Sequence, residues 1–155
     1  MTDEQDNAGV VAPPPLIYAG PLLLGLLLNR KFEVPFLPRG VARILGWSLL
    51  AGGALLVSWF ARTMRRADTP MDPREPVSRL VTAGPFRYTR NPAYLGLTMM
   101  YAGLSSLANA LPSILLLPAV LLVMQRGVIE REERYLEGKF DEEYLLYKAR
   151  VRRWI

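Results

Sequence analysis

Three long stretches of this chain carry no charged side chain, and they constrain its fold more than any other feature. Residues 7–29, 44–61 and 91–125 contain no Asp, Glu, Lys or Arg. A helix needs about 20 apolar residues to cross a bilayer, so each of the first two stretches supplies one crossing. The third is too long for one crossing and divides near Asn109 into two. The sequence therefore predicts an all-α polytopic membrane protein with four transmembrane helices.

Local signals set the expected ends of these helices. We expect the first helix to begin at the Pro13-Pro14-Pro15 cluster. The second should run over about 41–62, the third over 92–107, and the fourth from 111 onward. The fourth helix should continue past the charge-free stretch, because residues 125–137 hold strong helix formers and no proline. Gly138 is predicted to stop it, and Asp141 to cap a last helix that ends near Val151. This last helix is expected to form a cytoplasmic or interfacial extension, since an apolar stripe beside basic residues begins at Tyr144.

Composition excludes several classes of function. The chain has 155 residues, which is the size of one domain, and it contains neither Cys nor His. Without Cys there are no disulfides, thiolate metal sites or Cys nucleophiles, and without His there is no Ser-His catalysis. The commonest zinc ligands are missing, so we expect no metal site. The net charge of +5 is not spread over a soluble face, so we expect no nucleic-acid partner.

The basic residues gather in the segments between and after the helices. Seven arginines lie between the second and third helices, and eight Lys or Arg residues follow the third charge-free stretch. With four crossings these regions share one side with the N-terminus, and the positive-inside rule places that side in the cytoplasm. Arg30, Lys31 and Arg39 disagree, because they would face outward. Asp3 and Glu4 stand where a cleaved signal peptide has positive charge, so the first helix is expected to stay in the protein.

The most distinctive local sequence joins the arginine-rich segment to the third helix. It reads Gly84-Pro85-Phe86-Arg87-Tyr88-Thr89-Arg90-Asn91-Pro92-Ala93-Tyr94-Leu95-Gly96. Its first two residues form a turn. Asn91 is predicted to cap the helix with its side chain, because the first helical amides lack partners, and Pro92 suits the first helical position since it has no amide to lose. Two arginines and three aromatic rings at the end of a membrane helix suit a charged, flat ligand beside lipid.

A pair of glutamates past the fourth helix is expected to meet this segment. If the third and fourth helices form an antiparallel hairpin, Arg90 and the Glu132-Glu133 pair return to the same level. The reason is that both lie a similar number of residues from the hairpin tip near Asn109. Taken alone, such a contact favours a structural ion pair between two helix ends. A ligand site is the alternative.

These features and the closing residues 139–151 resemble the isoprenylcysteine carboxyl methyltransferase-like family and its relatives, the phospholipid N-methyltransferases. The likeness runs from about Gly84 to the end of the chain. The family pattern is Gly-Pro-aromatic-Arg-x-x-Arg-His-Pro-x-Tyr-x-Gly, followed further along by a Glu-Glu pair. Two positions depart from the family: Asn91 replaces the usual His, and Arg152 stands where a Pro often follows Val.

The resemblance implies that S-adenosylmethionine is the cofactor. An arginine suits its carboxylate, paired acids suit its ammonium group or ribose hydroxyls, and an aromatic ring or a turn suits its adenine. Carried over position by position, the cofactor-binding residues are Gly84, Pro85, Tyr88, Arg90, Asn91, Pro92, Tyr94, Gly96, Glu132 and Glu133. For catalysis we expect Arg126 to hold an anionic acceptor, and Glu130 to remove a proton where the acceptor carries one.

The predicted function is that of an integral-membrane methyltransferase that uses S-adenosylmethionine on a lipid-like or small apolar acceptor. We expect residues 1–83 to supply anchor helices and a cytoplasmic loop, and residues 84–155 to supply the cofactor-binding hairpin and the last helix, within one structural domain. The expected location is a bacterial inner membrane, with both termini cytoplasmic and membrane lipids as partners. The residues fit a prenylated cysteine, an aminophospholipid, a small thiol and a quinone-like lipid equally, and they indicate no oligomeric state.

Two other classes of function fit parts of the sequence. A membrane reductase related to the sterol reductases would bind NADPH with a similar C-terminal end, although it would need more crossings and a larger pocket. A non-enzymatic four-helix membrane protein would use Arg62, Arg65 and Arg66 only to bind anionic lipid. Titration with the methyl donor and with NADPH separates the three.

Overall fold

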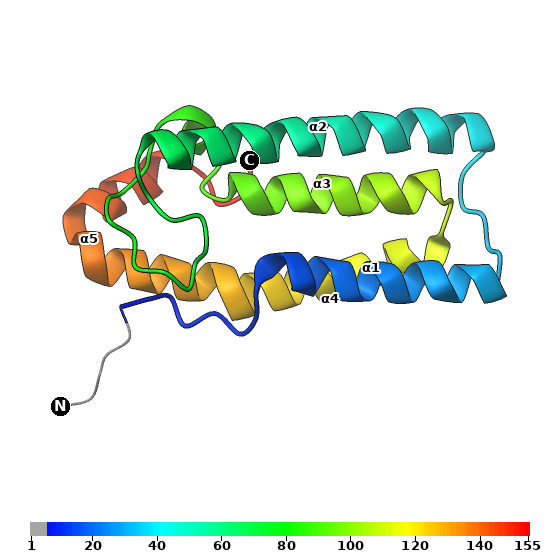
Figure 1. Cartoon of the computed structure of the whole chain (residues 1–155), viewed down its shortest axis with the longest axis horizontal. Coiled ribbons are helices and arrows are strands. Elements are labelled where there is room, and N and C mark those ends of the chain that lie inside the picture. The colour runs from blue at the N-terminus through cyan, green and yellow to red at the C-terminus, as the bar shows by residue number, and fades with distance from the viewer. Residues whose placement is uncertain (1–5) are drawn as a thin grey trace.

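Five α-helices make up the part of the chain that the structure describes, residues 6–155 (Figure 1). This computed structural model has no strand in that range, which confirms the all-α prediction, and Asp3 and Glu4 lie outside it. The helices are α1 Pro14–Lys31, α2 Arg39–Arg66, α3 Pro92–Leu107, α4 Leu111–Met124 and α5 Glu130–Arg150. A 3₁₀ helix, Gly84–Arg87, precedes α3, and a π-helical turn, Gln125–Ile129, joins α4 to α5.

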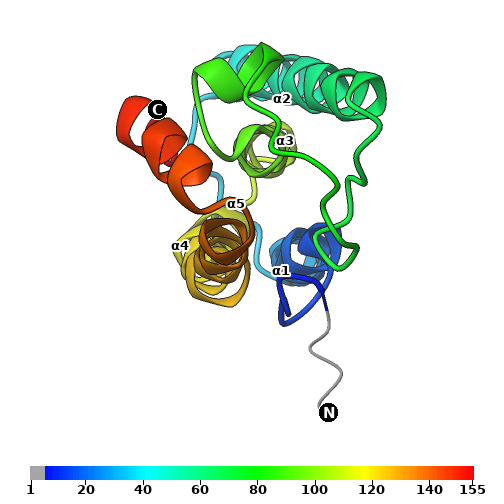
Figure 2. The ribbon, with the colours of Figure 1, turned by 90° about the vertical axis from the view of Figure 1, so that its left-hand side faces the viewer.

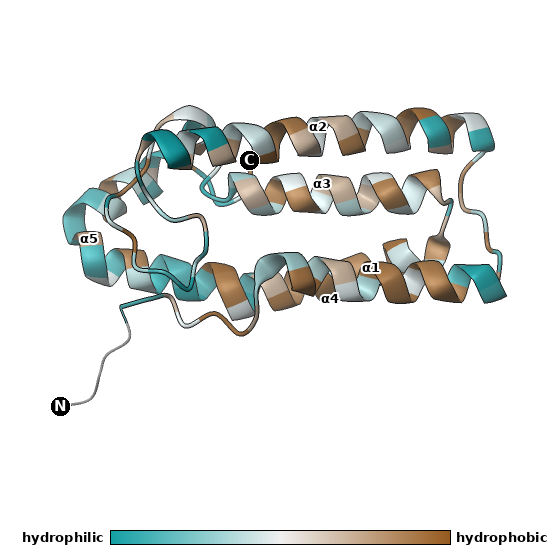
Figure 3. Cartoon of the chain, viewed as in Figure 1, coloured by the Kyte–Doolittle hydropathy of each residue, from teal (hydrophilic) through white to brown (hydrophobic). Residues whose placement is uncertain are grey.

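Within residues 6–155, two helices are long and apolar enough to cross a membrane: α2, and the continuous helix from Leu111 to Arg150 that contains α4 and α5. The apolar part of this long helix ends at Gln125, because its charged residues begin with Arg126. α3 has 16 residues. At 1.5 Å per residue it is about 24 Å long, which is shorter than the roughly 30 Å of a bilayer's hydrocarbon core. By length and hydropathy, α2 and the long helix are candidates for two of the four predicted crossings. Figure 3 shows the hydrophilic residues gathered toward the ends of the bundle.

α2 and α3 pack through glycines on their facing sides. A Cβ atom added to Gly53 would lie 2.6 Å from the carbonyl oxygen of Gly96, and one added to Gly103 would lie 2.9 Å from that of Gly46. The two backbones therefore touch, as is typical of helices packed within lipid. Viewed from its charged end, the bundle has α2 beside α3 and α1 beside α4 (Figure 2).

Buried tyrosines join these two pairs of helices. The Tyr18 hydroxyl of α1 donates to the carbonyl oxygen of Tyr94 at 3.2 Å and shares a hydrogen bond with the Thr98 hydroxyl at 2.9 Å. Tyr101 donates to the carbonyl oxygen of Ser113 on α4 at 2.8 Å. Each tyrosine thus satisfies its polar tip inside an apolar core, and together these bonds fix the position of α3 relative to α1 and α4.

The turn between α3 and α4 is fastened to the α1–α2 connection by Asn109, which has a left-handed backbone (φ 48°). Its side-chain oxygen accepts the amides of Phe36 and Leu37, each at 3.1 Å, and its side-chain nitrogen donates to the Leu37 carbonyl at 2.8 Å. One side chain therefore holds two connections together at the end of the bundle opposite to α5 (Figure 1).

The segment before α1 runs along the other end and is bonded to the long helix. The Val11 amide donates to the Gly127 carbonyl, in the π-helical turn, at 3.1 Å. Arg131 donates to the Gly9 carbonyl at 2.7 Å, and Lys139 forms an ion pair with Asp6 at 2.7 Å. These bonds place the prolines that begin α1 beside the charged part of the long helix.

The predicted stop at Gly138 is wrong, because the helix continues through it. The break comes at Asp141, whose backbone is not helical (φ 43°, ψ −118°), so the predicted side-chain cap there becomes a sharp bend. After the bend Tyr144 and Tyr147 are buried, and the Tyr147 hydroxyl donates to the Phe86 carbonyl at 2.8 Å. The bend therefore falls at Asp141, where the sequence indicated the start of a last helix, and the buried contact of Tyr147 with the 3₁₀ segment lies beyond it.

Candidate functional site

A cavity of about 500 Å³ lies where the charged ends of the helices meet. Its walls come from the start of α1, the end of α2, the loop over residues 69–81, the start of α3, and α5. Most of the lining is apolar, with Val57, Phe60 and Leu97 among its residues, and the charged residues in it are Asp72, Arg74, Arg79, Arg90, Glu132 and Glu133. Such a mixture suits a ligand that has both a charged and an apolar part.

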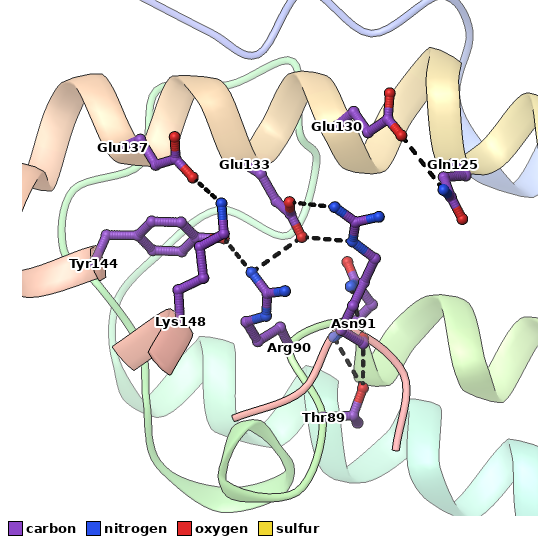
Figure 4. Close-up of polar contacts among 10 residues, drawn as sticks. Thr89, Arg90, Asn91, Gln125, Glu130, Glu133, Glu137, Tyr144 and Lys148 are labelled. Atoms are coloured by element: carbon purple, nitrogen blue, oxygen red, sulfur yellow. Dashed lines mark hydrogen bonds and ion pairs between the residues drawn. The ribbon is translucent and has the colours of Figure 1, made fainter. Parts of the chain in front are cut away.

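Glu133 lines this cavity, and several polar contacts converge on its carboxylate (Figure 4). Its Oε1 lies 3.1 Å from Nη1 of Arg90, and the Glu133 and Arg90 side chains are each 9% exposed. Arg153 binds the same carboxylate with two parallel hydrogen bonds of 2.9 and 2.7 Å. The predicted meeting of Arg90 with the glutamate pair is confirmed, and the carboxylate has a second guanidinium partner that no sequence pattern indicated.

The chain after α5 is bonded to the residues that precede α3. The Arg90 amide donates to the Arg152 carbonyl at 3.0 Å. The Arg153 carbonyl accepts the Thr89 hydroxyl at 3.1 Å and the Asn91 side-chain amide at 2.9 Å. These bonds, with the ion pair to Glu133, make the C-terminal segment part of the cavity's framework.

The predicted capping role of Asn91 is therefore wrong in one respect. Asn91 stands at the N-cap position of α3, but its side chain makes no capping hydrogen bond. It donates to the Arg153 carbonyl instead, a partner that only the folded chain brings near it. The Thr89 hydroxyl accepts the Asn91 amide at 3.1 Å and completes the turn into the helix.

Glu132 differs from its neighbour in its partners. It lines the cavity, is half-buried, and accepts one hydrogen bond, from the Tyr94 hydroxyl to Oε1 at 2.8 Å. No arginine or lysine within residues 6–155 forms an ion pair with it. Burial raises the pKa of this carboxyl to about 7, and the charge of Glu133 adds to the rise. The adjacent glutamates thus have different chemistry: one is bound by two arginines, and the other is free to meet a ligand.

Aromatic side chains cover another part of the cavity. Phe86, Tyr144 and Tyr147 belong to its lining. Burial raises the pKa of Tyr144 to about 12, so its hydroxyl stays neutral, and it accepts a hydrogen bond of 3.4 Å from Arg90. The sequence indicated both tyrosines only as members of an apolar stripe. Their spacing of three residues on one helix face was the one available signal.

Comparison with known proteins identifies the family. A family model described as Phospholipid methyltransferase matches residues 41–143, which is more than half of the chain. The chain belongs to the phospholipid methyltransferase family. An uncharacterised protein of Haemophilus influenzae is 54% identical over 35 residues, which are 23% of this chain and 56% of that protein. The chain therefore spans just over half of that relative's length. No solved structure matches this chain.

Six of the residues expected to bind a cofactor in this family line the cavity: Arg90, Asn91, Pro92, Tyr94, Glu132 and Glu133. The other four do not belong to its lining. Gly84 has φ 61° and stands so close to α2 that an added Cβ would lie 2.5 Å from the Thr63 hydroxyl. Gly96 packs against Gly53 of α2, Pro85 is buried in the loop, and Tyr88 is 68% exposed. These four residues therefore belong to the loop and to the face of α3 that packs against α2.

The two residues expected to take part in catalysis lie outside the cavity lining. Arg126 belongs to the π-helical turn and is exposed. Glu130 accepts a hydrogen bond of 3.4 Å from Gln125. The polar residues that do line the cavity include Glu132 and Tyr144.

The raised pKa of Glu132 predicts a pH dependence of stability. The folded protein holds this proton up to about pH 7, whereas an unfolded chain releases it near pH 4.5. Stability contributed by the protonated group is therefore full below about pH 4.5 and is lost as the pH rises to about 7. We expect the thermal midpoint in detergent to fall over this window, and the fall to be smaller in Glu132→Gln.

Glu130→Gln is the matched control, because Glu130 lies two residues earlier on the same helix but outside the cavity lining. It should keep the wild-type pH profile. Infrared difference spectra of wild type and Glu132→Gln should also show a protonated carboxyl that is lost near neutral pH. Identical pH profiles in all three proteins would contradict the assignment of this proton to Glu132.

Proposed function

We propose that the protein is an integral-membrane methyltransferase that takes its methyl group from S-adenosylmethionine and gives it to a lipid-like or small apolar acceptor. One observation carries the proposal most directly. The buried guanidinium of Arg90 lines the cavity, and its Nε has no hydrogen-bond partner within residues 6–155. A buried donor without a partner is costly, so this atom suits a ligand that brings an acceptor.

The residues of the cavity fit each part of the proposed donor. Arg90 suits the carboxylate of its amino acid group, since guanidinium and carboxylate form charge-assisted hydrogen bonds. Glu132 suits the ammonium group or the ribose hydroxyls. The rings of Phe86, Tyr144 and Tyr147 offer faces for the adenine. The volume of about 500 Å³ falls within the range of roughly 300–1,000 Å³ that is common for ligand pockets.

When bound, S-adenosylmethionine supplies a methyl carbon attached to a positively charged sulfur. Methyl transfer requires alignment of that carbon with the acceptor and exclusion of water. Arg90 and Glu132 would orient the polar half of the donor. The apolar side chains of α2 and α3, Val57, Phe60 and Leu97, would seat the hydrocarbon part of the acceptor and keep water out.

We propose four crossings, formed by α1, α2, α3 and the apolar part of the helix that begins with α4, and we place the cavity on the cytoplasmic side. The arginines of the loop between α2 and α3 support this orientation. Glu132 would then accept a proton from an acceptor that carries one, because it is the cavity carboxylate that no arginine binds. An acceptor that is itself a carboxylate would need no such step.

Calorimetric titration of the purified protein in detergent tests the proposal. S-adenosylmethionine should bind, and NADPH should not. Arg90→Ala should weaken binding of the methyl donor by about 1.5–3 kcal/mol, or roughly 10- to 150-fold, because a charge-assisted contact is lost.

Arg87→Ala is the control for this variant, because Arg87 lies in the same loop but is exposed and outside the cavity lining. It should bind the donor as the wild type does. Binding of NADPH alone would favour a reductase, and binding of neither molecule would remove the enzyme assignment. Equal affinities in Arg90→Ala and wild type would reject the site.

A further inference from the structure

A second cavity, of about 710 Å³, lies at the opposite end of the bundle, between the α1–α2 connection and the α3–α4 turn. Three exposed arginines line it: Arg30 near the end of α1, and Arg39 and Arg43 in the first turns of α2. None of them forms an ion pair with a carboxylate within residues 6–155. Glu33 is the one acidic residue in the lining. The cavity therefore carries a net positive charge.

The shape of this cavity is fixed by hydrogen bonds and by close packing. Asn109, which belongs to the lining, holds the amides of Phe36 and Leu37 and so fastens one wall to the other. At the start of α2, a Cβ added to Gly46 would lie 2.9 Å from the Leu107 amide nitrogen. The arginines therefore project from a preorganised frame, which lowers the cost of binding a ligand between them.

The position of two of these arginines on α2 is unfavourable without a ligand. Arg39 and Arg43 lie at the helix end where the macrodipole is positive, and the first turn of α2 contains no acidic residue. Pro38 stands at the N-cap and makes no side-chain capping bond. Two cations at this end repel the dipole and each other, and a bound anion would turn both repulsions into attractions.

Exposed apolar side chains around the cavity indicate where the anion comes from. Trp47, which belongs to the lining, is 60% exposed, and Ile44 and Phe32 are 72% and 58% exposed. These residues lie where the charge-free stretches of α1 and α2 end, which is the level of the interface between lipid and water. A soluble anion gains little from apolar neighbours. A lipid can contact the arginines with its headgroup and the apolar side chains with its acyl chains.

We propose that this cavity binds the phosphate group of an anionic membrane phospholipid, whose acyl chains lie along the exposed apolar side chains of α2. The site is separate from the cavity that contains Glu133 and does not depend on methyl transfer. Asn29 also lines it, and the buried side-chain oxygen of Asn29 receives no hydrogen bond from any described residue. A hydroxyl on the headgroup would supply that donor, which makes phosphatidylglycerol the probe of choice.

The test compares lipid binding by purified, delipidated protein in detergent. Short-chain phosphatidylglycerol is titrated while bound lipid is counted by native mass spectrometry and the thermal midpoint is followed. We expect saturable binding of phosphatidylglycerol, a raised midpoint, and little effect of phosphatidylcholine of the same chain length. The double variant R39Q/R43Q should bind phosphatidylglycerol at least about tenfold more weakly, because two cations that contact the headgroup are removed.

The matched control is R62Q/R66Q, which removes two exposed arginines with the same spacing from the other end of the same helix. It should keep the affinity of the wild type. Equal losses in the two double variants would show diffuse attraction to charge and would overturn the proposal, as would unchanged binding in R39Q/R43Q. Glycerol phosphate should not raise the midpoint at matching concentrations. If it does, the ligand is a soluble anion and the lipid assignment is wrong.

Discussion

Glu133→Gln should destabilise the charged end of the bundle by about 3–5 kcal/mol, because it removes the carboxylate that two arginines share. Arg90 would remain almost fully buried next to a neutral amide. Arg153 would lose its only ion pair within the described residues, and the segment that follows α5 would separate from the residues before α3. The expected result is a lower thermal midpoint and rapid trypsin cleavage after Arg150 and Arg152.

In the wild type these cleavage sites should be protected, because the carbonyl oxygens of Arg152 and Arg153 are hydrogen-bonded. Glu137→Gln is the control, since Glu137 also loses a salt bridge, with Lys148, but both side chains are about one third exposed. A pair of that kind contributes about 0–1 kcal/mol. Similar cleavage rates and midpoints in the two variants would show that the Glu133 cluster does not hold the segment in place.

Gly53→Ala should separate α2 from α3 and lower the thermal midpoint, at a cost of about 1–3 kcal/mol in stability. Its Cβ would lie 2.6 Å from the Gly96 carbonyl oxygen and 3.0 Å from the Met100 amide nitrogen. Both are backbone atoms, so a whole helix must move to relieve the contact. Val57, one turn further along α2, lines the cavity, so donor affinity should fall as well.

Gly52→Ala is the matched control, because it places the same methyl group on the neighbouring residue. Its Cβ would meet only the terminal methyl of Met99, at 2.9 Å, and a flexible side chain can move aside. Because alanine is the better helix former by about 1 kcal/mol, Gly52→Ala should be neutral or stabilising. If the two variants have equal midpoints, the contact between the backbones of α2 and α3 is not tight.

The parts of the fold that could be predicted are those that local chemistry determines. Pro92 begins α3 and Leu111 begins α4, as the sequence indicated, since proline restricts the backbone and the polar hairpin tip interrupts an apolar run. The meeting of Arg90 with the glutamate pair, which it makes through Glu133, was also predictable, because two helices of similar length return to the same level. Each of these inferences needs only sequence spacing and elementary helix geometry.

The parts that could not be predicted depend on contacts between distant segments. Arg153 belongs to no motif, and only the folded chain shows that its carbonyl takes the side chain of Asn91. The local sequence marks a break near Asp141, but it does not report that Tyr144 and Tyr147 beyond the bend become buried. The sequence also could not predict that Glu132 and Glu133 have different partners. Glu132 accepts a hydrogen bond from Tyr94, whereas Glu133 forms an ion pair with Arg90.

The π-helical turn Gln125–Ile129 has a consequence for everything that follows it. An α-helix rotates by about 100° with each residue, and a π-helical turn accommodates one extra residue without breaking the helix. Without it, the tandem glutamates would be presented about 100° away around the helix axis, and Arg90 would face a different side of the helix. The direction in which the acidic pair points around the helix axis is therefore set by the π-helical turn that precedes it.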